Sequence, residues 1–167
     1  MSRHFSTADS DLITDRLMLR SWTADEVAAV LDGRRLAHWA EDFPAEGDRV
    51  IVSLVAEHPG WLTEYGHRQI IECETGLVVG SLGLFWPPVD GALEIGYGVV
   101  GSRQGRGYAT ESTSALAEFA LTTTEVHTVY ANVELSNPAS IRVLEKAGFQ
   151  HWGTADDKAR FRIIAAD

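Results

Sequence analysis

The stretch VVGSRQGRGYATESTSALAEFA, residues 99–120, places three glycines within seven positions, between an apolar run and a segment with helical spacing. The glycines are Gly101, Gly105 and Gly107, and two arginines and a glutamine lie among them. Glycine lets the backbone turn tightly and expose its N–H groups, and the first turn of a helix has unpaired N–H groups beside a positive dipole end. The stretch therefore predicts a loop that holds a phosphate or pyrophosphate where a helix begins, near Tyr108.

Three phosphate-binding motifs can be compared with this loop. The P-loop requires a Gly-Lys pair, and the sequence contains none. The dinucleotide fingerprint G-x-G-x-x-G/A fails at its last position, where Thr110 follows Gly105 and Gly107. The motif Q/R-x-x-G-x-G/A is satisfied by QGRGYA, with Gln104, Gly107 and Ala109 at the required positions.

The segments around the loop predict a mixed sheet with helices on its faces. Alternating apolar residues indicate strands, and three consecutive strands with short joints indicate an antiparallel meander. Thr23 and Glu26 have the spacing of a capping box at the start of the first helix. The order β-α-α-β-β-β-α-β-α-β-β is typical of an α/β domain. The predicted strands are 12–22, 67–74, 77–86, 92–100, 126–135, 149–155 and 160–165, and the predicted helices are 23–39, about 48–58, 108–121 and 137–148.

Length and composition predict one domain in the cytoplasm. The chain has 167 residues, of which 45% are hydrophobic and 23% are charged, as in ordinary globular domains. We interpret residues 1–11 as a flexible N-terminal tail without the apolar core of a secretion signal, and residues 12–167 as a single domain. No apolar run approaches the ~20 residues that span a bilayer, so no membrane partner is expected. The single cysteine, Cys73, lies between Glu72 and Glu74 in a strand pattern, which favours packing over nucleophilic chemistry.

The net charge of −10 disfavours a nucleic-acid partner, because such binding needs an excess of Lys and Arg. The charge is uneven: residues 1–94 carry 16 acidic and 7 basic residues, whereas residues 95–167 carry 8 and 7. This asymmetry fits a cationic substrate on one side and an anionic ligand on the other. Surface acids that keep the protein in solution explain it equally well.

The QGRGYA motif resembles the coenzyme A loop of the GNAT superfamily of N-acetyltransferases. The upstream EIGYGVV resembles the family's fourth strand, and NPASIRVLEKAGF, about 30 residues after the loop, resembles its second signature. The N-terminal TDRLMLRSW is similar to the subgroup that contains the ribosomal-protein N-terminal alanine acetyltransferases. From about residue 12 onward, the resemblance implies an α/β fold with about four helices on a mostly antiparallel, seven-stranded mixed sheet. Its fourth and fifth strands are expected to splay apart.

The resemblance implies acetyl-CoA as co-substrate, without a metal, bound where the two strands splay. The pyrophosphate would rest on the loop N–H groups, and the pantetheine would pair with the backbone of the preceding strand as an added strand does. Arg103 and Arg106 are either phosphate contacts or solvated surface charges. Asn137 matches the Asn that contacts pantetheine in the family, and before a proline it is also a good helix cap. The implied cofactor-binding residues are Val99, Val100, Gln104, Gly105, Arg106, Gly107, Tyr108, Ala109, Thr110, Asn137 and Ser140.

The implied chemistry is direct attack of an amine on the thioester through a tetrahedral intermediate, which requires a base, an oxyanion donor and an acid. Glu94 matches the position of the base in several members, and its alternative role is that of a surface carboxylate. Many members have a Tyr as the acid seven residues after the Asn, where this chain has Leu144. In the resembled subgroup a Ser three residues after the Asn lies near the sulfur, which implies that Ser140 is catalytic. Tyr97 and Tyr108 are alternatives to it.

The acceptor pocket is expected to come from the first two helices, their connection and the last strands. AHWAEDFP, residues 37–44, offers aromatic and acidic side chains that suit a cation, although half of them are expected in the core or in caps. The expected acceptor is a small amine metabolite or antibiotic. A peptide N-terminus, or a non-catalytic sensor that binds acyl-CoA, is an alternative, and the fold is compatible with a homodimer. The predicted substrate-binding residues are His38, Trp39, Glu41, Asp42, Phe43 and Tyr97.

Overall fold

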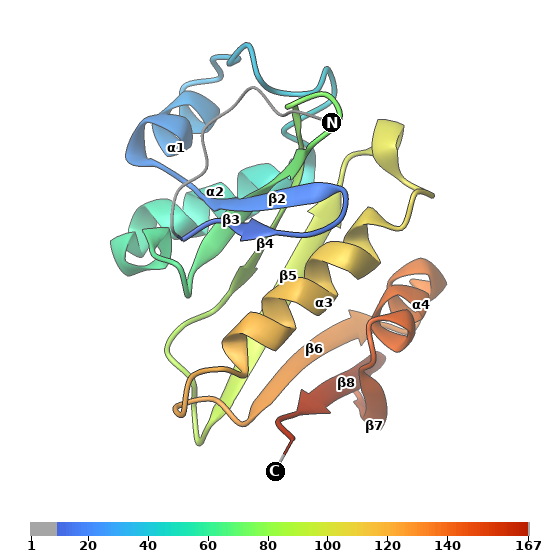
Figure 1. The fold of residues 1–167 in the computed structure, drawn as a ribbon. Coiled ribbons are helices and arrows are strands. Elements are labelled where there is room, and N and C mark those ends of the chain that lie inside the picture. The colour runs from blue at the N-terminus through green and yellow to red at the C-terminus, as the bar shows by residue number, and fades with distance from the viewer. Residues whose placement is uncertain (1–9, 167) are drawn as a thin grey trace.

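The computed structural model describes residues 10–166 and arranges them around one eight-stranded mixed sheet (Figure 1). The strand order is β1-β2-β3-β4-β5-β6-β8-β7. Every neighbouring pair is antiparallel except β5 and β6, which are parallel. The strands are β1 (Leu12–Ile13), β2 (Leu17–Ser21), β3 (His67–Glu72), β4 (Val78–Leu84), β5 (Ala92–Val99), β6 (Thr128–Glu134), β7 (Gln150–Ala155) and β8 (Lys158–Ile164).

Four α-helices lie on the two faces of this sheet (Figure 1). The first two pack against each other on one face, over the half of the sheet that contains β3 and β4. The last two pack against each other on the opposite face, with α3 over β5 and α4 beside β7. The helices are α1 (Ala24–Leu31), α2 (Glu46–Glu57), α3 (Tyr108–Ala120) and α4 (Pro138–Lys146), and the 3-10 turns are η1 (Pro59–Leu62) and η2 (Gly101–Arg103).

The predicted α/β fold class is confirmed, with two local differences. The strand predicted over 12–22 is divided by a turn, in which the Thr14 N–H donates to the Leu17 carbonyl (2.9 Å), so the sheet has eight strands instead of seven. The helix predicted over 23–39 begins with the expected capping box but ends at Leu31. Gly33 follows with a left-handed φ of 74°, a conformation that ends a helix and that favours glycine.

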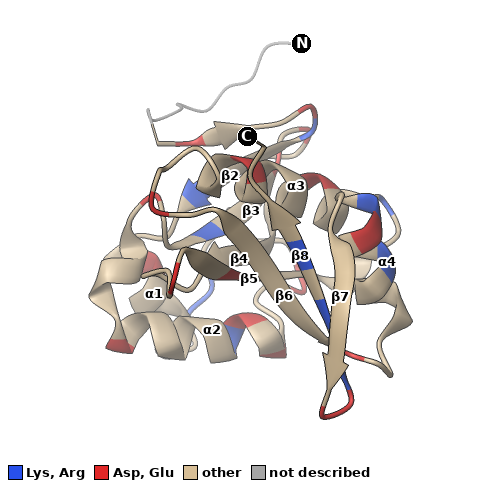
Figure 2. Ribbon diagram, turned by 90° about the horizontal axis from the view of Figure 1, so that it is seen from below, with Lys and Arg blue, Asp and Glu red and all other residues tan. Residues whose placement is uncertain are grey.

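Burial divides the sheet into two halves. All residues of β3 and β4 are buried, because helices cover both of their faces. Along β6 and β8 burial alternates: Val129, Ala131 and Phe161 are buried beneath α3 and α4, whereas Asn132 and Arg160 on the other face are exposed. The C-terminal half of the sheet therefore has one face without a helix (Figure 2).

The predicted N-terminal tail lies mostly outside the described residues, since the structure describes the chain from Ser10 onward. Asp11, the last residue assigned to that tail, forms an ion pair with Arg20 on β2 (2.8 Å). Cys73 is half-buried just after β3, and its N–H donates to the Arg16 carbonyl. None of the helices within residues 10–166 has the length and apolar character needed to cross a membrane.

Candidate active site

The strands β5 and β6 separate at one end, and this fork is the centre of the site. They pair only from Ala92 to Glu94 on β5 and from Thr128 to Tyr130 on β6. Beyond that row β5 continues to Val99 and β6 to Glu134 without pairing to each other. These are the two strands that the sequence predicts to splay apart, and the structure confirms the splay (Figure 1).

A cavity of about 560 Å³ lies at the open end of the fork, between β5, the loop after it and α4. The loop reaches α3 through Gly105 and Gly107, whose φ angles of 80° and 81° are left-handed. Gly107 is the N-cap residue of α3. Only glycine adopts this conformation without strain, so these two positions shape a cradle of backbone at the start of the helix.

The structure brings nine of the eleven predicted cofactor-binding residues to this cavity. The other two lie elsewhere: Val100 is in the core with 1% of its surface exposed, and the Arg106 guanidinium is turned to Glu72. The nine that line the cavity are Val99, Gln104, Gly105, Gly107, Tyr108, Ala109, Thr110, Asn137 and Ser140.

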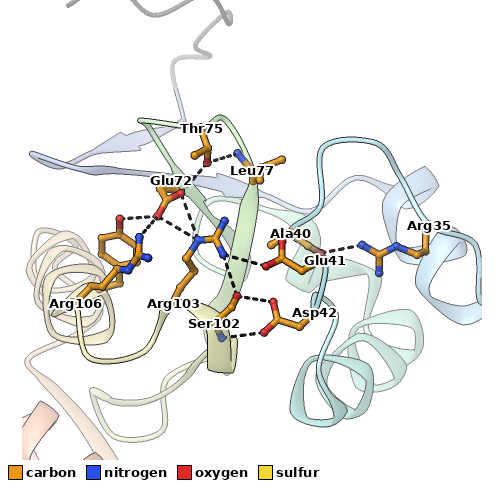
Figure 3. A network of polar contacts seen from close by, with 11 residues as sticks. Arg35, Ala40, Glu41, Asp42, Glu72, Thr75, Leu77, Ser102, Arg103 and Arg106 are labelled. Carbon is orange, nitrogen blue, oxygen red and sulfur yellow. Dashed lines mark hydrogen bonds and ion pairs between the residues drawn. The ribbon is translucent and has the colours of Figure 1, made fainter.

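The loop is held by Glu72, at the end of β3, whose carboxylate is almost fully buried (Figure 3). Its oxygens accept hydrogen bonds from the Tyr108 hydroxyl (2.7 Å) and the Thr75 hydroxyl (2.7 Å). They also pair with Arg103 (3.5 Å) and Arg106 (3.3 Å). Burial raises the pKa of Glu72, but these donors outweigh it and lower the pKa below its ordinary value. Glu72 therefore stays ionised and fixes both arginines of the loop.

Two acidic residues predicted for the acceptor instead hold the same loop from its other side (Figure 3). Asp42 accepts hydrogen bonds from the Ser102 N–H (2.9 Å) and the Ser102 hydroxyl (2.8 Å). Glu41 pairs with Arg103 at 3.4 Å. The connection between α1 and α2 thus supports η2 rather than opening a pocket of its own.

The remaining residues of that predicted cluster are also placed away from the cavities of the site. Trp39 and Phe43 are in the core, with 4% and 0% of their surfaces exposed and their rings 5.5 Å apart. His38 is exposed and lies 3.3 Å from a carboxylate oxygen of Glu26. Tyr97, the sixth residue predicted to bind substrate, lines the cavity at the fork.

The N-terminus of α4 forms the wall opposite β5. The Asn137 side-chain oxygen accepts a hydrogen bond from the Ser140 N–H (3.2 Å), which makes Asn137 the helix cap. The Tyr97 hydroxyl donates to the Ser140 carbonyl (3.1 Å), and burial raises the pKa of the Tyr97 phenol. Leu144 is fully buried, and the Tyr108 hydroxyl is bound to Glu72. Ser140 and Tyr97 both line the cavity at the fork, and the Tyr97 hydroxyl is held against the Ser140 backbone.

Glu94 lies where the fork begins, on the face of the sheet that carries α1 and α2. It pairs in register with Tyr130, at the last row that joins β5 to β6. The side chain is half-buried, and it does not line the cavity that holds Ser140. Burial raises the pKa of Glu94, and Lys158 offsets this only in part.

A second cavity, of about 520 Å³, lies on the opposite face of β5, beneath α2. It shares Tyr97, Gly98 and Val99 with the first cavity, so this short piece of β5 separates the two. Its walls are mainly apolar, with the buried Asp48 and His67 as titratable groups. Asp48 already accepts hydrogen bonds from the Ser81 hydroxyl and the Ala45 N–H.

Two basic residues that line the first cavity are not among the predicted site residues. Arg142 and Lys146 both line it from α4, together with Arg103 from the loop. Residues four apart on a helix share a face. Two basic residues at this spacing, just after the predicted Asn137 cap, are the pattern in the sequence that indicates a basic helix face beside the cofactor. Within residues 10–166 no group of three or more His, Cys, Asp or Glu side chains could hold a metal ion.

The family model described as "Acetyltransferase (GNAT) domain" matches residues 16–150, which include the fork, the loop and α4. The chain belongs to the GNAT acetyltransferase family.

Two curated proteins are similar in sequence to this GNAT chain. One is the uncharacterized N-acetyltransferase p20 of Bacillus licheniformis, 34% identical over 98 residues, 57% of this chain and 55% of that protein. This alignment spans only about half of that relative. The other is named "Probable N-acetyltransferase YjcK", from Bacillus subtilis, and is 32% identical over 132 residues, 77% of this chain and 72% of that protein.

Solved structures share the GNAT fold at lower sequence identity. One is the ribosomal L7/L12 α-N-protein acetyltransferase RimL in complex with coenzyme A, with a TM-score of 0.65, 20% identity, and 93% of this chain and 98% of that one covered. Another is the spermidine N-acetyltransferase of Vibrio cholerae in complex with CoA and spermine, with a TM-score of 0.62, 16% identity, and 90% and 96% covered. At these identities the likeness establishes the fold alone.

Proposed function

We propose that the protein transfers the acetyl group of acetyl-CoA to a primary amine by direct attack. The observation that carries this proposal is the pair of cavities on opposite faces of β5, which share Tyr97–Val99 beside the fork as their common wall. Two substrates can therefore approach one point from opposite sides of the sheet. A transfer without a covalent enzyme intermediate needs such an arrangement.

The cavity at the fork fits coenzyme A. The left-handed glycines give its pyrophosphate a row of backbone N–H groups at the start of α3, where the helix dipole favours negative charge. Arg103, Arg142 and Lys146 add positive charge to a cavity that otherwise belongs to an acidic protein. The RimL and spermidine acetyltransferase structures contain CoA, which supports the same cofactor here.

The open edge of β5 supplies the next part of the mechanism. Because β6 pairs with β5 only as far as Glu94, the edge of β5 toward the fork has no strand of residues 10–166 beside it from Ile95 to Val99. Pantetheine can pair there as an added strand does, and an N–H of this segment can stabilise the oxyanion of the tetrahedral intermediate.

Glu94 and Ser140 are assigned the proton transfers. An amine with a pKa near ~10 is protonated at neutral pH, and Glu94, with its raised pKa, accepts the proton that leaves it. The amine nitrogen then forms a bond to the thioester carbon and the carbon–sulfur bond breaks. Ser140 donates a proton to the thiolate and takes up in return the second proton that the nitrogen loses as it becomes an amide. Tyr97, whose hydroxyl lies against the Ser140 carbonyl, is the alternative donor.

We infer that the protein acts in the cytoplasm and that its acceptor is a small amine metabolite or antibiotic. The cavity beneath α2, of about 520 Å³, is in the size range of small-molecule sites and is mainly apolar. A protein N-terminus is the second candidate, favoured by the fold likeness to RimL and by the sheet face without a helix next to the fork.

A thiol-release assay tests the proposal. Acetyl-CoA is incubated with the protein and a panel of amines that includes aminoglycosides, polyamines and peptides beginning with Ala or Ser. We expect release of CoA thiol that depends on the amine. Binding of acetyl-CoA without transfer to any amine would contradict the proposal and favour a sensor.

A further inference from the structure

Within residues 10–166 no helix covers the face of β6, β8 and β7 that lies away from α3 and α4. In Figure 2 these three strands lie in front, and β8 carries several basic positions. A third cavity, of about 460 Å³, lies on this face and is lined by residues that include Tyr130, Arg160, Arg162 and Trp152. The established parts of the site use none of these residues.

Trp152 lies on the same face as Arg162, because it is two residues after Gln150, which pairs with Arg162. The ladder between β7 and β8 shifts register between His151 and Gly153, so Trp152 is the extra residue of a bulge. The guanidinium carbons of Arg162 and Arg160 lie 4.9 and 5.7 Å from the centroid of the indole ring. Stacking on an aromatic ring orients a guanidinium and leaves its N–H edges available to a ligand.

The two arginines have no acidic partner among residues 10–166, where the ion pairs involve other side chains. Paired guanidiniums with free N–H edges match the geometry of a carboxylate.

The position of this cavity connects it to the acceptor. Glu94 pairs in register with Tyr130, and Tyr130 pairs with Arg162, so the three side chains form one row on one face of the sheet. Strands in a sheet are about 4.8 Å apart, which puts the backbones of Glu94 and Arg162 roughly 10 Å apart. The pKa of the Tyr130 phenol is raised above its ordinary value, first by burial and then by the charge of Glu94. The charge of Arg160 opposes this rise only in part.

We propose that the acceptor carries a carboxylate within roughly 10 Å of its amine, and that Arg160 and Arg162, stacked on Trp152, bind that carboxylate while the amine lies at Glu94. This inference rests on the proposed function, since it assigns the acceptor of the same reaction. Two kinds of acceptor combine an amine with a nearby carboxylate: a small ω-amino acid, and a peptide N-terminus with an acidic side chain among its first residues. A polyamine brings only positive charge to the arginines and is disfavoured.

Matched pairs test the charge requirement for both kinds of acceptor. In the first arm, the protein receives acetyl-CoA with 6-aminohexanoate or with 6-aminohexanamide. In the second arm, it receives the peptide amide Ala-Ala-Asp-Ala or its counterpart Ala-Ala-Asn-Ala. Spermidine is the cationic comparison, and kcat/KM is measured from thiol release. We expect the acidic member of at least one pair to exceed its neutral partner by about 10-fold or more, as the loss of a charged hydrogen bond predicts.

The double variant Arg160→Gln/Arg162→Gln tests the residues. We expect it to abolish the preference for the acidic acceptor, mainly through KM, and to leave the KM for acetyl-CoA and the rate with the neutral acceptor unchanged. Arg34→Gln is the matched control, because Arg34 is an exposed arginine paired with Asp32 after α1. Melting curves verify that each variant is folded.

Several outcomes separate this inference from the proposed function. Equal use of acidic and neutral acceptors, or a preference for spermidine, overturns the inference and leaves amine acetylation intact. If no amine is acetylated, calorimetry measures the binding of 6-aminohexanoate in the presence of desulfo-CoA. Binding to the native protein that is lost in the double variant supports the carboxylate site. The absence of binding to the native protein overturns it. Sedimentation that shows a dimer in the native chain and a monomer in the double variant also overturns it, because a second copy then covers this face.

Discussion

Glu94 combines a half-buried carboxylate with a position at the start of the fork, and its protonation should control the rate. Burial raises the pKa of Glu94, so this carboxylate takes up its proton at a higher pH than an ordinary glutamate. We therefore expect kcat to fall with decreasing pH at a pH above the ordinary pKa of glutamate. We expect Glu94→Gln to lower kcat at neutral pH by about 10²-fold and to remove this acidic limb from the pH profile. Glu134→Gln, an exposed carboxylate at the end of β6, is the control. A variant that keeps both rate and limb would exclude Glu94 as the base.

Ser140 is tested by the loss of its hydroxyl. We expect Ser140→Ala to lower kcat by about 10-fold or more, because the thiolate then leaves without its proton, and to leave the KM for acetyl-CoA unchanged. Ser136→Ala, an exposed serine just before α4 that does not line the cavity, should have no effect. Full activity of the Ser140 variant would transfer this role to Tyr97, whose replacement by Phe is then the next measurement.

At the scale of elements, the loop between β5 and α3 depends on its left-handed glycines. Gly107→Asp adds a side chain and a negative charge where the pyrophosphate is expected, so calorimetry should show acetyl-CoA affinity reduced by about 100-fold or more. Gly33→Asp is a matched control, since Gly33 has a similar φ (74° against 81°), open space around it and no contact with the cavity. Unchanged affinity of the Gly107 variant would refute the placement of the pyrophosphate.

This loop also shows what a sequence can and cannot predict. The glycines, the capping box at Thr23 and the Asn137 cap are local patterns, and the structure contains each of them. The segment 37–44 was interpreted as an acceptor pocket, although its acids bind a loop 60 residues away in the chain. Aromatic and acidic residues suit a pocket, a core or a tether equally well, and only tertiary packing decides between them.

For the whole molecule, the buried His67 predicts a dependence of stability on pH. It is 1% exposed, neither ring nitrogen has a partner in the described part of the chain, and burial lowers its pKa from 6.5 to about 4. The unfolded chain therefore binds a proton below pH 6.5 that the folded chain binds only near pH 4. Stability should fall by about 3 kcal/mol as the pH decreases from 6.5 to 4 because of this group.

Urea unfolding at several pH values measures this effect against His67→Gln. The variant should lose less stability than the native protein over the same range, whereas His58→Gln, an exposed histidine after α2, should follow the native curve. Parallel curves for the native protein and the His67 variant would show that His67 takes up its proton in the folded state as readily as in the unfolded chain.

Calorimetric titration of the full chain with acetyl-CoA, desulfo-CoA and NAD tests whether the cavity at the fork is a coenzyme A site. The account predicts that acetyl-CoA and desulfo-CoA bind at one site per chain, and that NAD does not bind. Binding of NAD without binding of either CoA compound would contradict it.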